Sequence, residues 1–269
     1  AIGMGTPRET VRLVGELAAP RMVAPRSGAD WTDRMNRWAK GRSRQFADDE
    51  LCGFIFKKNS PSCGAYRVKV YQDGGMPLKQ GQGLFAAEFM RQHPLVPVEE
   101  DGRLNDPGLR ENFIERVFAL HRLRRIFAGR WSRGAIVDFH AREKYLLMAH
   151  DAQTLKQLGQ LVAAIKQHTP ATFRDLYMAG FMAALGKTAT IARHVNTLQH
   201  IAGYLRPHLS DAERHRVLAI IEEYRLGIVP LIVPMTIVRH YIELHDVAYV
   251  GTQTYLNPHP RELMLRNHV

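Results

Sequence analysis

The stretch "DPGLRENFIERVFALHRLRRIFAG", Asp106 to Gly129, divides this 269-residue chain into two styles of sequence. It begins with Asp106 as a helix cap and Pro107 in the first turn, and apolar residues then recur at helical spacing. Before this stretch, Gly and Pro interrupt short strand-like runs, whereas long helical periods with few breakers follow it. The sequence therefore predicts a domain boundary near Asp106, with the new helix as the link between two domains.

The part before the link is predicted to be a small α/β domain, a sheet with helices that is incomplete in this chain. A basic amphipathic helix is expected from Thr32 to Phe46, and another helix over residues 82–92. Between them, the apolar run "LCGFIF" (51–56) and the alternating run "YRVKVY" (66–71) are typical of strands. The segment "PLVPVEEDGRLNDP" (94–107) is expected to be irregular because it is rich in Pro, Gly and acids.

The part after the link is predicted to be entirely helical. We assign residues 1–127 to the α/β domain and residues 128–269 to an all-α domain. The helices are expected at residues 133–150, 151–168, 170–185, 188–205, 211–226 and 235–244. Ser210 and Glu213 have the spacing of a capping box, which marks the start of one of these helices.

Charge and cysteine content narrow the class of protein. The formal net charge of +11 makes a polyanion such as RNA a plausible partner, although a solvated basic surface explains the same number. The two cysteines, Cys52 and Cys63, fit neither a disulfide framework nor a paired metal-ligand spacing, which indicates a reducing, cytoplasmic location. The longest apolar stretch (226–238) is too short to span a bilayer and contains Pro230 and Pro234, so no membrane association is expected.

The segment "KKNSPSCG" (57–64) holds Cys63 in a loop between the two expected strands. Pro61 fixes the approach to the cysteine, Gly64 permits a tight exit, and two serine hydroxyls flank the thiol. That setting favours a thiolate. From the residues alone, Cys63 could be a nucleophile, a metal or cluster ligand, or a small turn residue. Cys52, inside the apolar strand, is interpreted as a core residue.

Three segments of the first part together resemble the thiouracil desulfidase family: "GMGTPRETVRLVG" (3–15), "GFIFKKNSPSCG" (53–64) and "HPLVPVEEDGRLNDPGLRENFIERVFA" (93–119). The helical remainder, with "VDFHAREKYLLMAH" (137–150), is similar to the YbgA-like domain that often follows that domain. The likeness covers about the first 125 residues and then the helical part, in the expected order.

The resemblance implies a [4Fe-4S] cluster held by three cysteines, with one iron left open to take sulfur from a thiocarbonyl. Cys63 matches the third ligand. The first two family cysteines, and an acidic residue thought to act beside the serine, are expected upstream of the given chain. The chain as given is therefore expected to be inactive, and the intact protein to be the enzyme. Ser62 is the expected catalytic residue, and Arg8 and Ser60 are expected to bind substrate.

Basic residues of the second part are candidates for RNA contact. The segment "HRLRRIFAGRWSRG" (121–134) contains Trp131, which could stack on a base, and several arginines that could bind phosphate. These arginines are Arg122, Arg124, Arg125, Arg130 and Arg133. His140 and Lys144 lie four residues apart on one helical face and are expected to contact phosphate or thiobase, because lysine repels a metal cation.

The function expected for the intact protein is non-redox hydrolytic removal of sulfur from thiolated uracil, with 4-thiouridine in tRNA as the expected substrate. The helical domain would then hold the tRNA. One alternative is a desulfidase that acts on free thiouracil, a small molecule. The other is a non-catalytic RNA-binding protein, which the shortage of cluster ligands in this chain favours. No protein partner can be identified from the sequence.

Overall fold

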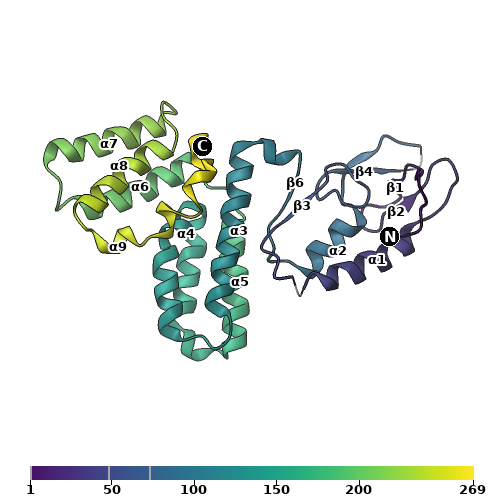
Figure 1. The fold of residues 1–269 in the computed structure, drawn as a ribbon, viewed down its shortest axis with the longest axis horizontal. Coiled ribbons are helices and arrows are strands. Elements are labelled where there is room, and N and C mark those ends of the chain that lie inside the picture. Colours follow the sequence, from purple (N-terminus) through teal and green to yellow (C-terminus); the bar gives the residue numbers. More distant parts are fainter. Residues whose placement is uncertain (1, 48, 73) are drawn as a thin grey trace. The chain divides into compact units, whose positions relative to one another are not determined.

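The computed structural model describes residues 2–47, 49–72 and 74–269 and divides the chain into two units, with the boundary between Asp106 and Pro107 (Figure 1). The expected fold class is confirmed, because the first unit contains small mixed sheets with helices and the second is mostly helical. The helix that starts at Pro107 belongs to the second unit, whereas the sequence-based limit at residue 127 included it in the first.

The strands of the first unit form two small sheets. The larger sheet has the order β2 (Arg21–Val23), β1 (Arg12–Val14), β4 (Val68–Tyr71) and β5 (Leu78–Gly81). In it, β1 and β4 are parallel and the other neighbours are antiparallel. Leu13 lies opposite Met22 on one side and Val70 on the other, and all three side chains are fully buried. This row of apolar pairs fixes the register, because a slip of one residue would expose all three.

The smaller sheet joins β3 (Phe54–Phe56) in parallel to β6 (Val98–Glu100). The expectation that residues 94–107 are irregular is wrong for β6. Val98 and Glu100 are buried there, and the neighbouring Glu99 is paired with Arg103, whose Nε lies 2.6 Å from its Oε1. Two adjacent carboxylates are compatible with a buried strand because each has hydrogen-bond partners.

Helices α1 (Thr32–Gln45) and α2 (Leu84–Gln92) pack against each other in the first unit. Met35, Ala39 and Ser43 recur every fourth residue and are the buried face of α1. Aromatic rings fill the space around α2, where the ring centroids of Phe54 and Phe89 are 4.5 Å apart. The core of this unit therefore depends on residues of α2 and of β3, the strand that directly precedes the Cys63 loop (residues 57–67).

Two acidic side chains at the end of β6 hold the two ends of the Cys63 loop. Asp101 Oδ1 accepts a hydrogen bond of 3.0 Å from the amide of Lys58. Glu100 Oε1 accepts hydrogen bonds from the amides of Ala65, at 2.9 Å, and Tyr66, at 3.1 Å. Because Glu100 is only 2% exposed, its carboxylate replaces water as the acceptor for these amides.

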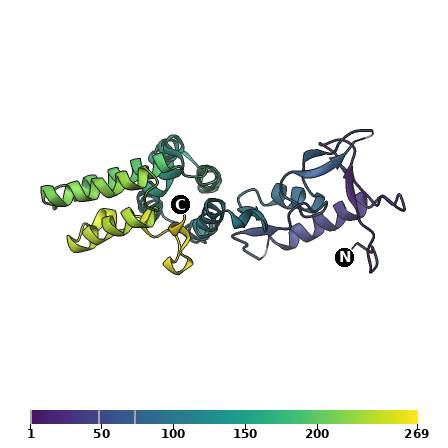
Figure 2. The same cartoon turned by 90° about the horizontal axis from the view of Figure 1, so that it is seen from above.

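The second unit consists of helices joined by short connections. Their bounds are α3 (Pro107–Phe127), α4 (Arg133–Ala163), α5 (Pro170–Leu185), α6 (Ile191–Leu205), α7 (Asp211–Arg225), α8 (Ile232–Leu244) and α9 (Ala248–Gly251). Helix α4 is broken at Asp151, where φ is −158° and ψ is 95°, so the expected boundary between two helices at His150 and Asp151 is confirmed. Figures 1 and 2 show α7 and α8 side by side.

Local signals predicted several helix ends correctly. At the start of α7, Ser210 and Glu213 make both hydrogen bonds of the capping box. Helix α5 has the predicted bounds, with Thr169 as its cap. Helix α8 begins at Ile232, three residues before the expected Met235, because Pro234 lies in the first turn, where a helix does not need its missing amide. Within the described residues, no helix combines the length and the apolar character needed to cross a bilayer.

The Glu100→Ala variant should destabilise the first unit by about 1–3 kcal/mol, because the buried amide of Ala65 loses its acceptor. Glu100→Gln is the matched control, since its amide oxygen can still accept both hydrogen bonds, and it should cost less. Urea denaturation followed by circular dichroism measures both values. Equal losses in the two variants would show that the hydrogen bonds to Glu100 do not hold the loop.

Candidate functional site

The segment Ser60-Pro61-Ser62-Cys63-Gly64 folds into a tight turn. The amide of Gly64 donates a hydrogen bond of 2.8 Å to the carbonyl oxygen of Ser60. The amide of Cys63 donates to Ser60 Oγ at 3.1 Å. Ser60 therefore shapes the turn with both its backbone and its side chain, as serine commonly does in loops.

The turn is docked on the start of helix α2. The amide of Leu84 donates to the carbonyl oxygen of Pro61 at 3.1 Å, and the amide of Phe85 donates to that of Ser62 at 2.9 Å. The first amides of a helix have no partner within it, and the N-cap residue Gly83 has no side chain to accept them. The carbonyl groups of the turn take that role, so the positive end of the α2 dipole lies against the turn that carries Cys63.

Two glycines make this docking possible. A Cβ atom on Gly83 would lie 2.5 Å from the carbonyl carbon and oxygen of Ser62. A Cβ atom on Gly64 would lie 2.9 Å from the carbonyl oxygen of Ser60. Both distances are too short for any other residue, so the two glycines are needed for a close backbone approach.

The two serine hydroxyls lead to the thiol. Ser60 Oγ lies 3.1 Å from Ser62 Oγ, which in turn lies 3.3 Å from Cys63 Sγ. A thiolate at Cys63 can only accept, so Ser62 would donate to it and could accept from Ser60. The two hydroxyls therefore form a chain that ends at Cys63 Sγ.

Ser62 and Cys63 line a pocket of about 400 Å³. The remaining lining residues come from the N-terminal segment, including Arg8, and from α1, which contributes Met35 and Trp38. The structure thus places three predicted site residues, Arg8, Ser62 and Cys63, around one cavity. Ser60 does not line the pocket. Its hydroxyl instead contacts Ser62 Oγ and accepts a hydrogen bond from the Cys63 amide within the turn.

Trp38 was not predicted as a site residue. Its ring is partly exposed and packs on Phe85, with 5.2 Å between the ring centroids. The signal in the sequence was the spacing of Met35 and Trp38, three residues apart and therefore on one helical face. That spacing could not show that Met35 and Trp38 line the same pocket as Ser62 and Cys63.

The pocket offers fewer cysteine ligands than an iron-sulfur cluster needs. A [4Fe-4S] cluster takes three or four thiolates, with histidine as a rarer ligand in other clusters. Cys63 is the only cysteine among the lining residues, and Cys52 lies elsewhere. In the part of the chain that the structure describes, no group of three His, Cys, Asp or Glu side chains is arranged to hold a metal. These residues fit one ligand of a cluster and do not fit a whole cluster.

Among the predicted RNA-contacting residues, Arg122 is engaged within the second unit. Its Nε lies 2.9 Å from Glu143 Oε1, and its Nη1 donates to the carbonyl oxygen of Pro258 at 2.8 Å. His140 Nδ1 is 3.0 Å from the hydroxyl of Tyr177, and burial lowers the pKa of His140, so this imidazole is neutral at pH 7. The three contacts tie together distant parts of the helical unit.

The other predicted residues differ in exposure. Lys144 and Arg124 are partly buried, and Lys144 places its Nζ 5.1 Å from the ring centre of Tyr145. Arg125, Arg130 and Arg133 are exposed.

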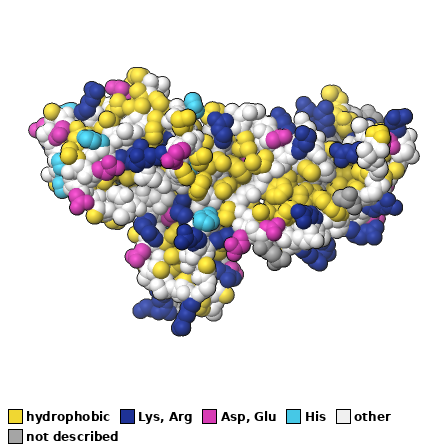
Figure 3. Space-filling view, in the orientation of Figure 1, with side chains coloured by type: hydrophobic (Ala, Val, Ile, Leu, Met, Phe, Trp, Pro, Cys, Tyr) yellow, Lys and Arg dark blue, Asp and Glu magenta, His cyan; other side chains and the backbone are white. Residues whose placement is uncertain are grey.

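Aromatic contacts show where the exposed arginines lie in the fold. Trp131 lies between α3 and α4 and contacts Phe127 at the end of α3 and Phe173 in the first turn of α5, at 5.4 and 5.6 Å. The end of α3, the start of α4 and the start of α5 therefore meet at one end of the helices. Figure 3 shows Lys and Arg side chains at the lower end of these helices. We call Arg125, Arg130 and Arg133 the basic end.

Comparison with known families gives two matches in this chain. Residues 1–101 match the family described as 2-thiouracil desulfurase. Residues 144–260 match a family described as a protein of unknown function, DUF1722. No solved structure shows significant similarity to the chain.

A curated relative connects the chain to a named protein. The chain is 35% identical over 153 residues to the uncharacterized protein YbgA of Escherichia coli (strain K12). The aligned part is 56% of this chain and 90% of the relative. The chain therefore belongs to the YbgA family and combines a 2-thiouracil desulfurase domain with a DUF1722 region that follows it.

Proposed function

We propose that the intact protein removes sulfur from a thiolated uracil base held in the pocket of Ser62 and Cys63. The observation that carries this proposal is the meeting of Ser62, Cys63, Arg8 and Trp38 around one cavity inside the domain that matches 2-thiouracil desulfurase. In the net reaction, the oxygen of water replaces sulfur at the ring carbon and the sulfur leaves as hydrogen sulfide. No electrons are gained or lost.

Each side chain of the pocket has a role in this proposal. The ring of Trp38 offers a flat apolar surface on which a pyrimidine can stack. The Arg8 guanidinium offers several N–H donors to a carbonyl oxygen of the base. Ser62 is placed to relay a proton, because its hydroxyl can accept one from the attacking water and give its own to the leaving sulfur, with Ser60 Oγ 3.1 Å away to orient it.

The proposed reaction uses an iron-sulfur cofactor. Cys63 would supply one thiolate ligand, and the further ligands would come from outside the described residues. The fixed turn supports that role, since a ligand held by the backbone of α2 needs little rearrangement on binding iron. The roles of Trp38, Arg8 and Ser62 do not depend on the cluster.

The proposed physiological substrate is 4-thiouridine in tRNA, with the second unit as the tRNA-binding part and the cytoplasm as the location. Support comes from the net charge of +11 and from the exposed arginines of the basic end. Arg122 is a weaker candidate for phosphate contact because Glu143 already neutralises it. His140 and Lys144 remain candidates for contact with RNA.

Two alternatives each have an observation in their favour. A cavity of about 400 Å³ can hold a free thiobase without any RNA around it, which favours a small-molecule desulfidase. The presence of a single cysteine at the pocket favours a non-catalytic RNA-binding protein.

Cys63→Ala in the intact protein, reconstituted anaerobically with iron and sulfide, should abolish both bound iron and sulfide release from a thiolated base. Cys52→Ala is the matched control and should retain both, because Cys52 does not line the pocket. Iron content and sulfide are measured by colorimetric assays. Full iron content in the Cys63→Ala protein would reject the ligand role.

Ser62→Ala should retain iron but slow sulfide release by about a hundredfold, the usual scale for a positioned proton-transfer group. Ser62→Thr keeps the hydroxyl and should restore most of the rate. If the alanine and threonine variants turn over equally, Ser62 has only a role in the turn.

Replacing Arg125, Arg130 and Arg133 with Ala should weaken tRNA binding and reduce the slope of log affinity against log salt by about one for each lost phosphate contact. A control variant with Ala at Arg37, Lys69 and Lys79 removes the same charge from exposed positions of the first unit. Filter binding over a range of salt concentrations measures both variants. Equal effects of the two triple changes would show that overall charge, and not the basic end, governs tRNA binding.

A further inference from the structure

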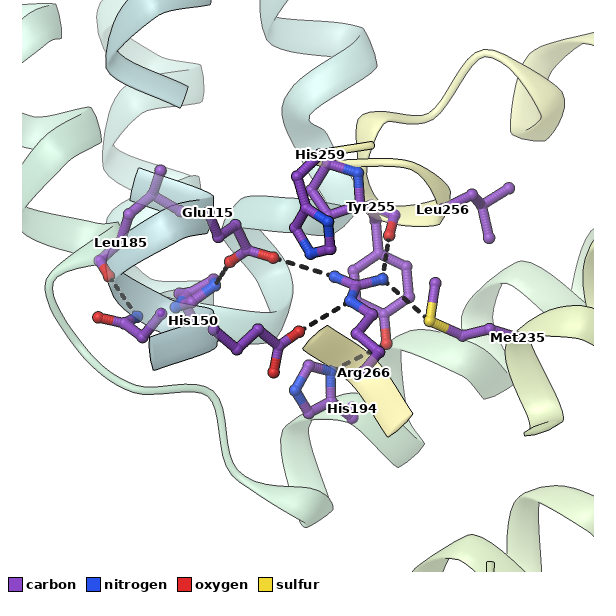
Figure 4. Close-up of polar contacts among 12 residues, drawn as sticks. Glu115, His150, Leu185, His194, Met235, Tyr255, Leu256, His259 and Arg266 are labelled. Atoms are coloured by element: carbon purple, nitrogen blue, oxygen red, sulfur yellow. Dashed lines mark hydrogen bonds and ion pairs between the residues drawn. The ribbon is translucent and has the colours of Figure 1, made fainter. Parts of the chain in front are cut away.

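The second unit contains a buried network of charged side chains that the proposed function does not use (Figure 4). Arg266 donates from Nε to Glu111 Oε1 at 2.9 Å and from Nη2 to Glu115 Oε2 at 3.0 Å. Its Nη1 donates to the carbonyl oxygen of Tyr255 at 2.6 Å. His150 bridges Glu115 Oε1, at 2.5 Å, and the carbonyl oxygen of Lys187, at 2.6 Å.

The charges of this network nearly cancel. Burial alone would raise the pKa of Glu115, but His150 and Arg266 outweigh it and hold that pKa below its usual value. Burial opposes the protonation of His150, yet the charge and hydrogen bond of Glu115 raise its pKa. For Glu111, burial prevails over Arg266 and raises the pKa. Arg266 and His150 thus offset Glu115 and any charge on Glu111.

Three members of the network, Glu111, Glu115 and His150, line a pocket of about 270 Å³. Glu111, His194 and Tyr224 line this pocket, and no hydrogen bond of Glu111 Oε2, His194 Nε2 or the Tyr224 hydroxyl is found within the described residues. His194 and Tyr224 are mostly buried side chains, 6% and 2% exposed. A pocket with a few convergent polar groups of this kind is typical of a ligand site.

The neighbours of His194 hold its imidazole in the neutral state. Burial lowers the pKa of His194 to about 3. His194 Nδ1 lies 2.9 Å from the hydroxyl of the fully buried Tyr255. That hydroxyl needs an acceptor, and Nδ1 is the one at hand, so the proton of His194 is on Nε2. The pocket therefore offers a donor at His194, a carboxyl oxygen at Glu111 and a hydroxyl at Tyr224.

Size and charge limit the ligand. A cavity of about 270 Å³ lies just below the range of about 300–1,000 Å³ typical of sites for drug-sized molecules, so it suits a single small ring. The carboxylates of Glu111 and Glu115 disfavour a phosphate, and the positive charges of Arg266 and His150 disfavour a cation. A neutral ring with an N–H beside a carbonyl group can pair with Glu111 and His194 together, while the Tyr224 and Ile191 side chains supply an apolar wall.

We propose that this pocket of the second unit binds a small neutral cyclic amide, the chemistry of a free pyrimidine base such as uracil, through Glu111, His194 and Tyr224. The ring N–H would donate to Glu111 Oε2, and the ring carbonyl would accept from His194 Nε2. The proposal does not rest on desulfuration in the first unit, since it uses residues of the second unit only.

The test is calorimetric titration of the 269-residue chain with uracil, in a Trp38→Ala background that removes the stacking surface of the first pocket. Uracil should bind saturably at one site. Tyr224→Phe should weaken this binding about three- to tenfold, the effect of one lost hydrogen bond. The same change should not lower the melting temperature, because the Tyr224 hydroxyl has no partner to lose within the described residues.

A blocking variant completes the experiment. Ala189→Phe fills the pocket and should abolish uracil binding, with circular dichroism to show that the helices are retained. Uridine 5′-monophosphate should not compete with uracil. The proposal is overturned if uracil fails to bind, if Tyr224→Phe leaves the affinity unchanged, or if the nucleotide binds as tightly as the base. Because sulfide release is not measured, these outcomes are independent of the fate of the desulfidase proposal.

Discussion

The close contact between the backbone at Ser62 and the backbone at Gly83 is the constraint on which the candidate active site depends. It lets the carbonyl groups of Pro61 and Ser62 accept hydrogen bonds from the first amides of α2. A loop alone could not hold Ser62 and Cys63 in one arrangement, because ordering each residue costs conformational entropy. The contact with a helix end and the hydrogen bonds to Glu100 and Asp101 offset that cost.

The second unit depends on a different interaction, the buried pairing of Arg266 with α3. Arg266 and Glu115 are 151 residues apart in the chain, so their hydrogen bond joins the last segment of the unit to its first helix. Burying these charges is costly in itself, and removing one partner of such a pair typically costs about 3–5 kcal/mol. The unit therefore tolerates the network only as a complete set of partners.

The two candidate sites differ in the chemistry they offer. The pocket of the first unit combines a thiol, hydroxyls and an arginine, which suit a reaction at sulfur. The pocket of the second unit offers a carboxyl group, a neutral imidazole and a phenol, which suit the recognition of a neutral ring. The basic end is a cationic surface of exposed arginines, whose chemistry suits contact with phosphate groups. Membership in the YbgA family is compatible with all three, because a fold by itself does not define a function.

The sequence by itself determined the helical second unit, its helix limits near Asp151 and Ser210, and the position of the Cys63 loop. These features depend on apolar periodicity, caps and turn residues, which act over a few neighbouring residues. It also predicted Arg8, Ser62 and Cys63 as site residues, and the structure places all three around one pocket.

Only the tertiary structure decided which distant residues meet. The sequence did not predict strand β6, because its acidic residues are unusual in a buried strand. Their partners lie far away in the chain, as the hydrogen bond between the Ala65 amide and Glu100 shows. Trp38 lines the same pocket as Ser62 and Cys63, and Arg122 is engaged because Glu143 lies opposite it. The pocket of Glu111, His194 and Tyr224 unites three helices. Pairings of this kind depend on packing across long sequence separations, and no local pattern of residue types records them.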